Sequence, residues 1–248
     1  MQRLKSHLEK LGIVDFGKTI DRFKIYQEFL HEYNSHTNLT SIKDLEEIET
    51  RHFIDSLAVL ECANNSQCTI KDNNNCEFFI QNCSLLDVGC GAGFPSIPIA
   101  IILDALNISY SLTLVDSVKK KTDFLEKLIE KLSLGNITII HSRVEDLSYL
   151  KNSFDIVLNR AVASLPTLLE YSLPFLKLGG HLIAHKGKNA EEELTVSKNA
   201  LSELGGKFIQ SIPYTLGDIE FKLLIIKKDL QTPEKYPRGQ NKPRLRPL

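Results

Sequence analysis

The sequence lacks any long apolar run. Its longest apolar stretches, such as Ile97 to Leu103, are far shorter than the roughly 20 residues that a membrane-spanning helix needs. The first residues, from Met1 to His7, also lack the apolar core of a secretory signal peptide. We therefore expect a cytoplasmic protein without a membrane partner.

Net charge is also nearly absent. The 30 Lys and Arg residues almost balance the 31 Asp and Glu residues, which leaves a formal net charge of −1. The net charge therefore does not favour binding to nucleic acid, and any surface that binds nucleic acid must be a local cluster of cations. The composition is 42% hydrophobic and 25% charged, which is typical of a globular chain long enough to bury a sizeable core.

Cysteines are few and confined to one stretch of the chain. They are Cys62, Cys68, Cys76, Cys83 and Cys90. No pair has the Cys-x-x-Cys spacing of a zinc knuckle, and their number is odd. A metal or disulfide role is the alternative, but we expect reduced thiols, as is usual in the cytosol, and no metal.

Residues 1–61 have the pattern of a helical extension. Apolar and aromatic residues recur there at helical spacing, at Ile20, Phe23, Tyr26, Leu30 and Tyr33. Asp44, followed by Glu47 three residues later, predicts the start of a second helix that runs to Leu60. Residues 62–83 are polar and are expected to form a connecting loop.

From residue 84 onward, short apolar runs alternate with helical patterns. The runs occupy residues 85–88, 111–115, 137–141, 154–158 and 181–184. Such alternation predicts a parallel sheet covered by helices on both faces. A last pair, 207–212 and 221–227, predicts an antiparallel hairpin at the sheet edge. We expect one α/β domain with a doubly wound, mostly parallel, seven-stranded sheet over 84–230, and a tail at 231–248.

The first predicted strand ends in Asp87 and a loop that contains Gly89, Gly91 and Gly93. Glycines at this turn let the backbone approach a ligand, because ligands bind beyond the carboxyl ends of the strands in a doubly wound sheet. A dinucleotide fingerprint would place its third glycine where this chain has Phe94. The spacing therefore favours a cofactor without phosphates, S-adenosylmethionine, over NAD. Asp87 can accept hydrogen bonds from loop amides or, through water, from the cofactor ammonium.

Three further positions follow the second and third predicted strands. Asp116 ends the second strand, where an acid can accept both ribose hydroxyls of an adenosine. After the third strand, an adenine ring would lie against Val144, with Glu145 as the nearby polar contact. The glycines alone would also fit a tight turn in any α/β protein. Together with these three residues they predict an S-adenosylmethionine site.

Several segments resemble the bacterial ribosomal RNA small subunit methyltransferase G family, which is also called glucose-inhibited division protein B. The segments are residues 38–42, 51–57, 87–95, 115–117, 160–165, 186–187 and 235–238. They occur in order from about residue 20 to the C-terminus. Ser96, which replaces an expected glycine, and the long 62–83 connection depart from the family pattern.

The resemblance implies a class I methyltransferase fold. It also implies methyl transfer from S-adenosylmethionine to N7 of one guanine in the 530 loop of 16S ribosomal RNA. The cofactor contacts carried over by motif are Gly89, Phe94, Val144, Glu145 and Arg160. We accordingly expect a monomer whose partner is 16S ribosomal RNA or the small ribosomal subunit.

Guanine N7 carries a lone pair and no proton, so methyl transfer needs alignment rather than a general base. Arg160 is the candidate positioning residue, for guanine O6, the cofactor carboxylate or a phosphate; a structural ion pair is its alternative. Candidate RNA contacts are Arg51, His52, Lys186, Lys235, Arg238, Arg244 and Arg246. Arg51 and His52 also fit a solvated helix face, and Lys186 also fits an ordinary strand end.

The last residues, 235–248, are basic and contain Pro237, Pro243 and Pro247. We expect an extended tail whose charges follow an RNA backbone; a solubilising end is the alternative. The rival functions are a methyltransferase acting on a protein or small molecule, an NAD(P)-dependent oxidoreductase, and an RNA-binding module without catalysis. The basic tail and the N-terminal helices favour RNA.

Overall fold

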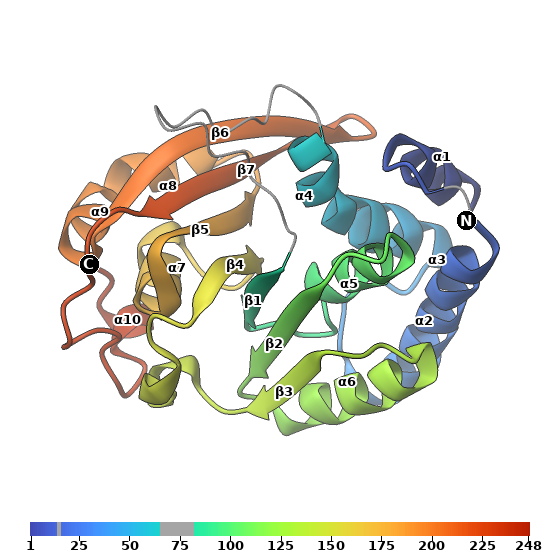
Figure 1. The fold of residues 1–248 in the computed structure, drawn as a ribbon, viewed down its shortest axis with the longest axis horizontal. Helices are drawn as coiled ribbons and strands as arrows, with labels where there is room; N and C mark the ends of the chain where they lie inside the picture. The colour runs from blue at the N-terminus through green and yellow to red at the C-terminus, as the bar shows by residue number, and fades with distance from the viewer. Residues whose placement is uncertain (14–15, 65–81) are drawn as a thin grey trace. The chain divides into compact units, whose positions relative to one another are not determined.

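The computed structural model describes residues 1–13, 16–64 and 82–248. Figure 1 draws the fold of these residues, and their contacts divide the chain into two compact units. Unit 1 comprises Met1–Asn82 and Cys90–His141, and unit 2 comprises Cys83–Gly89 and Ser142–Leu248. These units cut the chain differently from the four segments expected from the sequence, which stay a prediction.

Unit 1 begins with helices. They are α1 (Gln2–Lys10), α2 (Phe16–Thr37), α3 (Leu45–Ile48), the π-helical stretch η1 (Glu49–Ile54) and α4 (Asp55–Asn64). Asp44 caps α3, because its side chain accepts a hydrogen bond from the Glu47 amide at 2.9 Å. The predicted helix start at Asp44 is confirmed. The π-helical stretch that interrupts this helix was not predicted.

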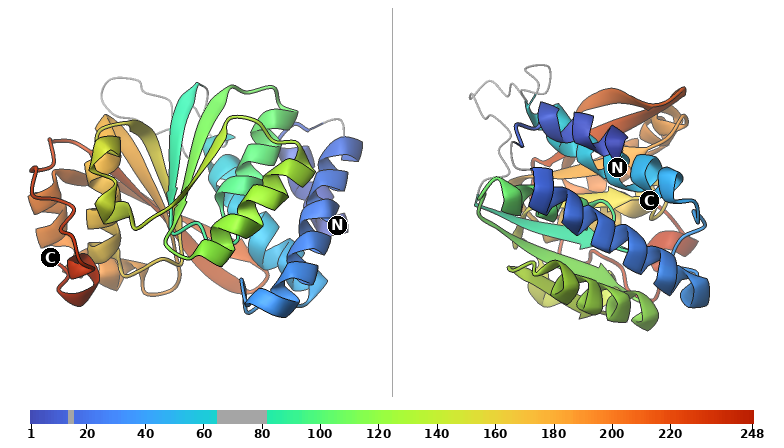
Figure 2. Two further views of the ribbon diagram at one scale, coloured as in Figure 1. Left: turned by 90° about the horizontal axis from the view of Figure 1, so that it is seen from below. Right: turned by 90° about the vertical axis from the view of Figure 1, so that its right-hand side faces the viewer.

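The rest of unit 1 is a parallel strand pair with helices. Strands β2 (Tyr110–Asp116) and β3 (Ile137–His141) pair in parallel, and α5 (Ser96–Ala105) and α6 (Lys119–Leu132) accompany them. Helix α2 runs beside α6 (Figure 2). The rings of Phe29 and Phe124 stack between these helices with their centroids 5.2 Å apart. The N-terminal helices therefore pack directly on elements of the sheet region.

Unit 2 holds the other strands. In β1 (Cys83–Val88), β4 (Phe154–Arg160) and β5 (Leu176–Lys186) the pairing is parallel, whereas β7 (Ile219–Lys228) is antiparallel to β5 and to β6 (Gly206–Leu216). The strand order is β3-β2-β1-β4-β5-β7-β6. The predicted seven-stranded, mostly parallel sheet with an antiparallel edge hairpin is confirmed. The hairpin turn is shorter than expected, because its strands extend to Leu216 and Ile219.

Helices and turns complete unit 2. They are η3 (Val144–Asp146), η4 (Ser148–Leu150), α7 (Leu165–Ser172), η5 (Leu173–Phe175), α8 (Ala190–Val196), α9 (Lys198–Leu204) and α10 (Lys242–Leu245). The central part of β4, from Ile156 to Asn159, is buried. Burial of this kind is typical of parallel strands that are covered on both faces.

The C-terminal residues are folded onto unit 2, which corrects the expectation of an extended tail. Tyr236 is 3% exposed, Pro243 is buried, and Lys242–Leu245 form the short helix α10. Arg238 pairs with the buried Glu170 and holds the segment in place. The prolines do not prevent this packing. Among the described residues, no helix is long and apolar enough to span a membrane.

Candidate cofactor site

The glycine loop after β1 is tightly packed in unit 1. Gly91 and Gly93 have φ values of 60° and 98°, in the left-handed region that favours glycine. A Cβ atom on Gly93 would lie 2.7 Å from Ile97 Cγ1 and 2.9 Å from Leu125 Cδ2. Because such distances are too short for any Cβ, position 93 requires glycine.

Asp116, at the end of β2, holds this loop. Its Oδ2 accepts hydrogen bonds from the Gly91 amide at 3.0 Å and from Lys121 Nζ at 3.3 Å, and its Oδ1 accepts one from the Val118 amide at 2.9 Å. The side chain is 4% exposed. A carboxylate offers about four acceptor positions, so these donors leave room for one ribose hydroxyl as the loop stands. A bond to both ribose hydroxyls requires one of these donors to move away.

Aromatic residues from the N-terminal helices also fix the loop. Phe94 is 6% exposed and stacks on Tyr26, with centroids 5.2 Å apart, and on His52, at 4.4 Å. The Tyr26 hydroxyl donates a hydrogen bond of 2.5 Å to the Ala92 carbonyl. The sequence identified Tyr26 only as part of a buried helix face. A buried tyrosine needs a partner for its hydroxyl, but only the fold identifies Ala92 as that partner.

The structure argues against an RNA contact by His52. Its ring is buried on Phe94, and its Nε2 lies 2.8 Å from Thr40 Oγ1. His52 is therefore placed to position the loop, and its RNA contact stays a prediction. The neighbouring Arg51 is 55% exposed and lies 3.6 Å from Glu47, one helical turn away. Arg51 stays a candidate for RNA.

In unit 2, the end of β1 is held by β4. Asn159 is fully buried; its Nδ2 donates to the Val88 carbonyl at 3.0 Å, and its Oδ1 accepts from Ser172 Oγ at 3.0 Å. Gly89 follows with a φ of 71°, and a Cβ atom there would lie 3.1 Å from Val162 Cγ1. Asp87 is fully buried within β1. The sequence did not single out Asn159 or Val162.

Val144 and Glu145 form the start of η3, as expected just after β3. Val144 is 5% exposed, and the side chain of Glu145 is 3% exposed. Glu145 Oε1 accepts a hydrogen bond from the Asn241 amide at 3.2 Å and lies 3.6 Å from Arg143 Nη1. The C-terminal segment thus contacts a predicted cofactor residue.

Two other predicted residues end neighbouring strands. Arg160 is half-buried at the end of β4, in register with His185 of β5. Lys186 is 8% exposed and donates to the Ala163 carbonyl at 2.8 Å and to Glu193 Oε2 at 2.7 Å. Because the ammonium group is buried and two of its three donors bind these partners, a structural role of Lys186 is favoured over the predicted RNA contact.

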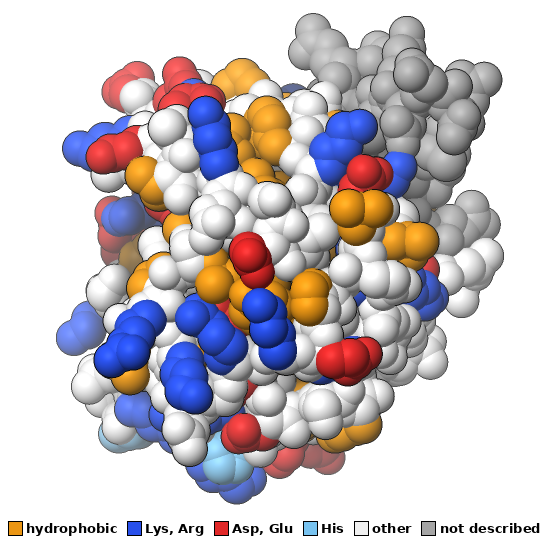
Figure 3. All heavy atoms as spheres, turned by 90° about the vertical axis from the view of Figure 1, so that its left-hand side faces the viewer, with side chains coloured by type: hydrophobic (Ala, Val, Ile, Leu, Met, Phe, Trp, Pro, Cys, Tyr) orange, Lys and Arg blue, Asp and Glu red, His pale blue; other side chains and the backbone are white. Residues whose placement is uncertain are grey.

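The four predicted RNA contacts in the tail have different surroundings. Lys235 is 65% exposed beside Glu203, and Arg246 is also exposed. Arg238 is bound to Glu170, which favours a structural role over its predicted RNA contact, whereas Arg244 is exposed and donates one bond to the Val162 carbonyl. Lys and Arg side chains, in blue, gather on one face of the molecule (Figure 3).

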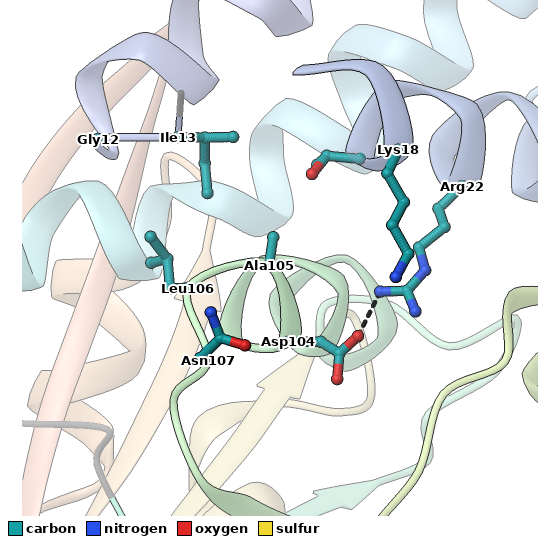
Figure 4. A pocket seen from close by; sticks show the side chains of 9 residues that line it. Gly12, Ile13, Lys18, Arg22, Asp104, Ala105, Leu106 and Asn107 are labelled. Atoms are coloured by element: carbon teal, nitrogen blue, oxygen red, sulfur yellow. Dashed lines mark hydrogen bonds and ion pairs between the residues drawn. The ribbon is translucent and has the colours of Figure 1, made fainter. Parts of the chain in front are cut away.

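A pocket elsewhere in unit 1 contains none of the predicted cofactor residues. Lys18 and Arg22 of α2 and Asp104 and Asn107 near the end of α5 line it, and Arg22 pairs with Asp104 (Figure 4). Its cations and its carboxylate face one another in the close-up. We therefore do not assign the cofactor to this pocket.

Two of the five cysteine side chains lie in the described part of the chain. Cys83 is half-buried and Cys90 is buried, and burial raises the pKa of the Cys83 thiol. Cys68 and Cys76 lie outside the described residues, as does the side chain of Cys62. In the described ranges no group of three or more His, Cys, Asp or Glu side chains is placed to hold a metal ion.

Comparison with known proteins gives one family. A family model described as rRNA small subunit methyltransferase G matches residues 19–214. A ribosomal RNA small subunit methyltransferase G from Acetivibrio thermocellus is 44% identical, over 92% of this chain and 88% of that protein. Another with the same name, from Lactobacillus acidophilus, is 42% identical over 93% of this chain and 92% of that protein.

Solved structures share the fold at low identity. A SAM-dependent methyltransferase from Aquifex aeolicus is 17% identical and superposes with a TM-score of 0.54, over 77% of this chain and 97% of that one. The [4+2]-cyclase SpnF is 16% identical with a TM-score of 0.51, over 72% and 81%. The class I methyltransferase fold is thereby confirmed. Since a cyclase has it too, the fold alone does not determine the reaction.

Proposed function

The chain belongs to the ribosomal RNA small subunit methyltransferase G family, and we propose that it methylates N7 of a guanine in 16S ribosomal RNA. It is an S-adenosylmethionine-dependent ribosomal RNA methyltransferase. The choice of N7, of a guanine in the 530 loop and of a monomeric enzyme is our proposal. The observation that carries it is identity above 40% over more than nine tenths of the chain.

The residues of each unit suit the cofactor. In unit 1, the loop from Gly91 to Phe94 provides backbone that lies close to the Asp116 carboxylate. In unit 2, Gly89 and the buried Val144 and Glu145 provide a close-packed turn and an acceptor. We propose that Asp116 binds the ribose and that Glu145 and Val144 bind the adenine. Asp87 is assigned to the loop amides.

The reaction needs little from acid or base groups. S-adenosylmethionine supplies an electrophilic methyl group on a sulfonium, and guanine N7 supplies the lone pair without losing a proton. The work of the chain is therefore to hold the base in line and to exclude water. We assign the base-positioning role to Arg160, which lies at the end of β4 beside the turn that contains Val162.

The acceptor must be an accessible guanine. In an A-form helix N7 faces a deep, narrow groove that side chains do not enter, so we propose a guanine in a loop or one that is splayed out. The remaining RNA candidates are the exposed cations Arg51, Lys235, Arg244 and Arg246.

The deciding experiment uses methyl-labelled S-adenosylmethionine with free 16S ribosomal RNA and, separately, with small ribosomal subunits lacking the modification. We expect label in 7-methylguanosine after nucleoside digestion, mapped to the 530 loop by fragment analysis. Arg160→Ala serves as the reduced-activity variant, with cofactor affinity measured in parallel. Label in another nucleoside, or only in protein or small molecules, would contradict the proposed acceptor.

A further inference from the structure

A buried ion pair fixes the C-terminal segment to α7. Glu170 of α7 has no exposed surface, and Arg238 surrounds its carboxylate. The Arg238 amide and Nε donate to Oε1 at 2.8 and 2.9 Å, and Nη2 donates to Oε2 at 2.6 Å. A buried carboxylate is tolerated only when it is paired and hydrogen-bonded, so Arg238 has little freedom to leave.

The chain beyond Arg238 folds back over the same helix. Arg238 Nη2 also donates to the Arg246 carbonyl at 2.8 Å, which closes residues 238–246 into a loop. Thr167 of α7 donates to the Pro243 carbonyl at 2.9 Å, and α10 lies against α7 (Figure 1). The buried side chain of Pro243 completes this contact. Residues 236–246 are thus a structured element, which we call the C-terminal loop.

This loop contacts two parts of the proposed cofactor site in unit 2. The Asn241 amide donates to Glu145 Oε1 at 3.2 Å, and Arg244 Nη2 donates to the Val162 carbonyl at 2.9 Å. The side chain of Val162 in turn lies against the Cα of Gly89, where a Cβ would be only 3.1 Å away. The first contact sets the position of Glu145, which we assign to the cofactor, and the second acts on Gly89 through Val162.

We propose that the C-terminal loop is a positioning element of the cofactor site. Arg238 holds the loop on Glu170, and through Asn241 and Arg244 the loop fixes the Glu145 carboxylate and the Val162 turn. The inference rests on the proposed function, because it takes Glu145 and Gly89 as cofactor contacts. It predicts that the tail determines cofactor affinity, even without RNA.

The test measures equilibrium binding of S-adenosylhomocysteine in the absence of RNA, by calorimetry on the full-length chain. We expect Arg244→Ala to weaken binding about tenfold, as for the loss of one hydrogen bond from a charged donor. Arg244→Lys, which can still reach a carbonyl with one donor, should restore most of the affinity. Arg238→Lys should weaken binding at least as much, because an ammonium does not replace a bidentate guanidinium.

The matched control is Arg22→Lys, which makes the same change in another Arg–carboxylate pair, Arg22–Asp104, and should leave the affinity unchanged. The melting temperature of each variant shows whether it folds. If Arg238→Lys does not fold, the comparison of Arg244→Ala with Arg244→Lys decides. Wild-type affinity in Arg244→Ala, or equal losses in Arg244→Ala and Arg244→Lys, would overturn the inference. Failure of the proposed function is distinguishable, since the wild-type chain itself would then not bind S-adenosylhomocysteine or not methylate 16S ribosomal RNA.

Discussion

Tyr26 of α2 contacts the glycine loop after β1 through its hydroxyl group. Tyr26→Phe keeps the stacking on Phe94 but removes the donor to the Ala92 carbonyl. A typical hydrogen bond contributes about 1 kcal/mol, so we expect cofactor affinity to fall about fivefold. Calorimetry with S-adenosylhomocysteine measures this. Tyr33→Phe removes a hydroxyl from the same helix and should leave affinity unchanged; equal effects of the two would refute a specific role for Tyr26.

Asp116 holds the glycine loop, and we propose that it also binds the cofactor ribose. Asp116→Asn preserves shape, but an amide cannot accept from Gly91 and Val118 at once and still bind ribose. Because bonds to a charged group contribute roughly 1.5–3 kcal/mol, we expect at least a tenfold loss of cofactor affinity. Asp123→Asn, in an exposed pair with Lys119, is the matched control. Undiminished affinity, or tighter binding of NAD than of S-adenosylmethionine, would contradict the assignment.

Lys228 is a buried cation that should make the stability of the protein depend on pH. It has no exposed surface, and its Nζ donates to Asn152 Oδ1 at 2.6 Å and to the Leu176 carbonyl at 2.8 Å. Burial lowers the pKa of Lys228 to about 8, whereas the unfolded chain has the ordinary value of 10.5. Between these values the unfolded state binds more protons, so stability increases as pH rises.

Urea unfolding of the wild type and of Lys228→Met from pH 8 to 10 tests this. Relative to the variant, the wild type should gain free energy of unfolding across that range, by at most about 3 kcal/mol. Well below pH 8 Lys228 is protonated in both the folded and the unfolded state, so the difference in free energy of unfolding between wild type and variant should be constant. Parallel stability curves over the whole range would show that Lys228 titrates normally in the folded protein.

The packing of the C-terminal segment could not be predicted from the sequence. Short apolar runs located the strands, with β3 at residues 137–141 as predicted, and the Asp44–Glu47 spacing located the helix cap, because both depend on local pattern. It did not locate the tail, because docking depends on Glu170, far from Arg238 in sequence. The available signal was a lone glutamate in the otherwise largely apolar stretch 165–175, which indicates a buried charge in need of a partner.

Stability of the tail–helix contact is a direct test of this pairing. Arg238→Ala leaves the Glu170 carboxylate buried without its cation, so we expect the free energy of unfolding to fall by about 3–5 kcal/mol. Lys177→Ala, which breaks the partly exposed pair with Asp155, should cost less than about 1 kcal/mol. Urea denaturation measures both. Similar losses in the two variants would show that the Arg238–Glu170 pair contributes no more than a surface pair.

The positions of the candidate site residues after the strands were predictable from the sequence, but the residues that hold them in place were not. The glycine loop, Asp116 and Glu145 follow strands at the expected places, because each strand end is encoded locally. Asn159, Val162 and the aromatic stack on Phe94 come from segments distant in sequence. His52 was a candidate RNA contact because it shares part of a predicted helix face with Arg51. The fold instead buries its ring, so pattern alone could not assign it.

The chain as a whole is nearly neutral, so ribosomal RNA must be recognised through local cations. Methyl transfer to guanine N7 depends on alignment rather than on a general base. Since guanine N7 has no proton to lose, the single-turnover methylation rate should be nearly flat from about pH 6.5 to 8.5. Rapid mixing of saturating enzyme, RNA and labelled S-adenosylmethionine measures this rate. RNA carrying 7-deazaguanine at the target should bind with unchanged affinity yet accept no label, because it lacks the N7 lone pair. A rate that rises with a pKa near that of histidine, or methylation of the 7-deaza substrate, would place the methyl group on a different atom.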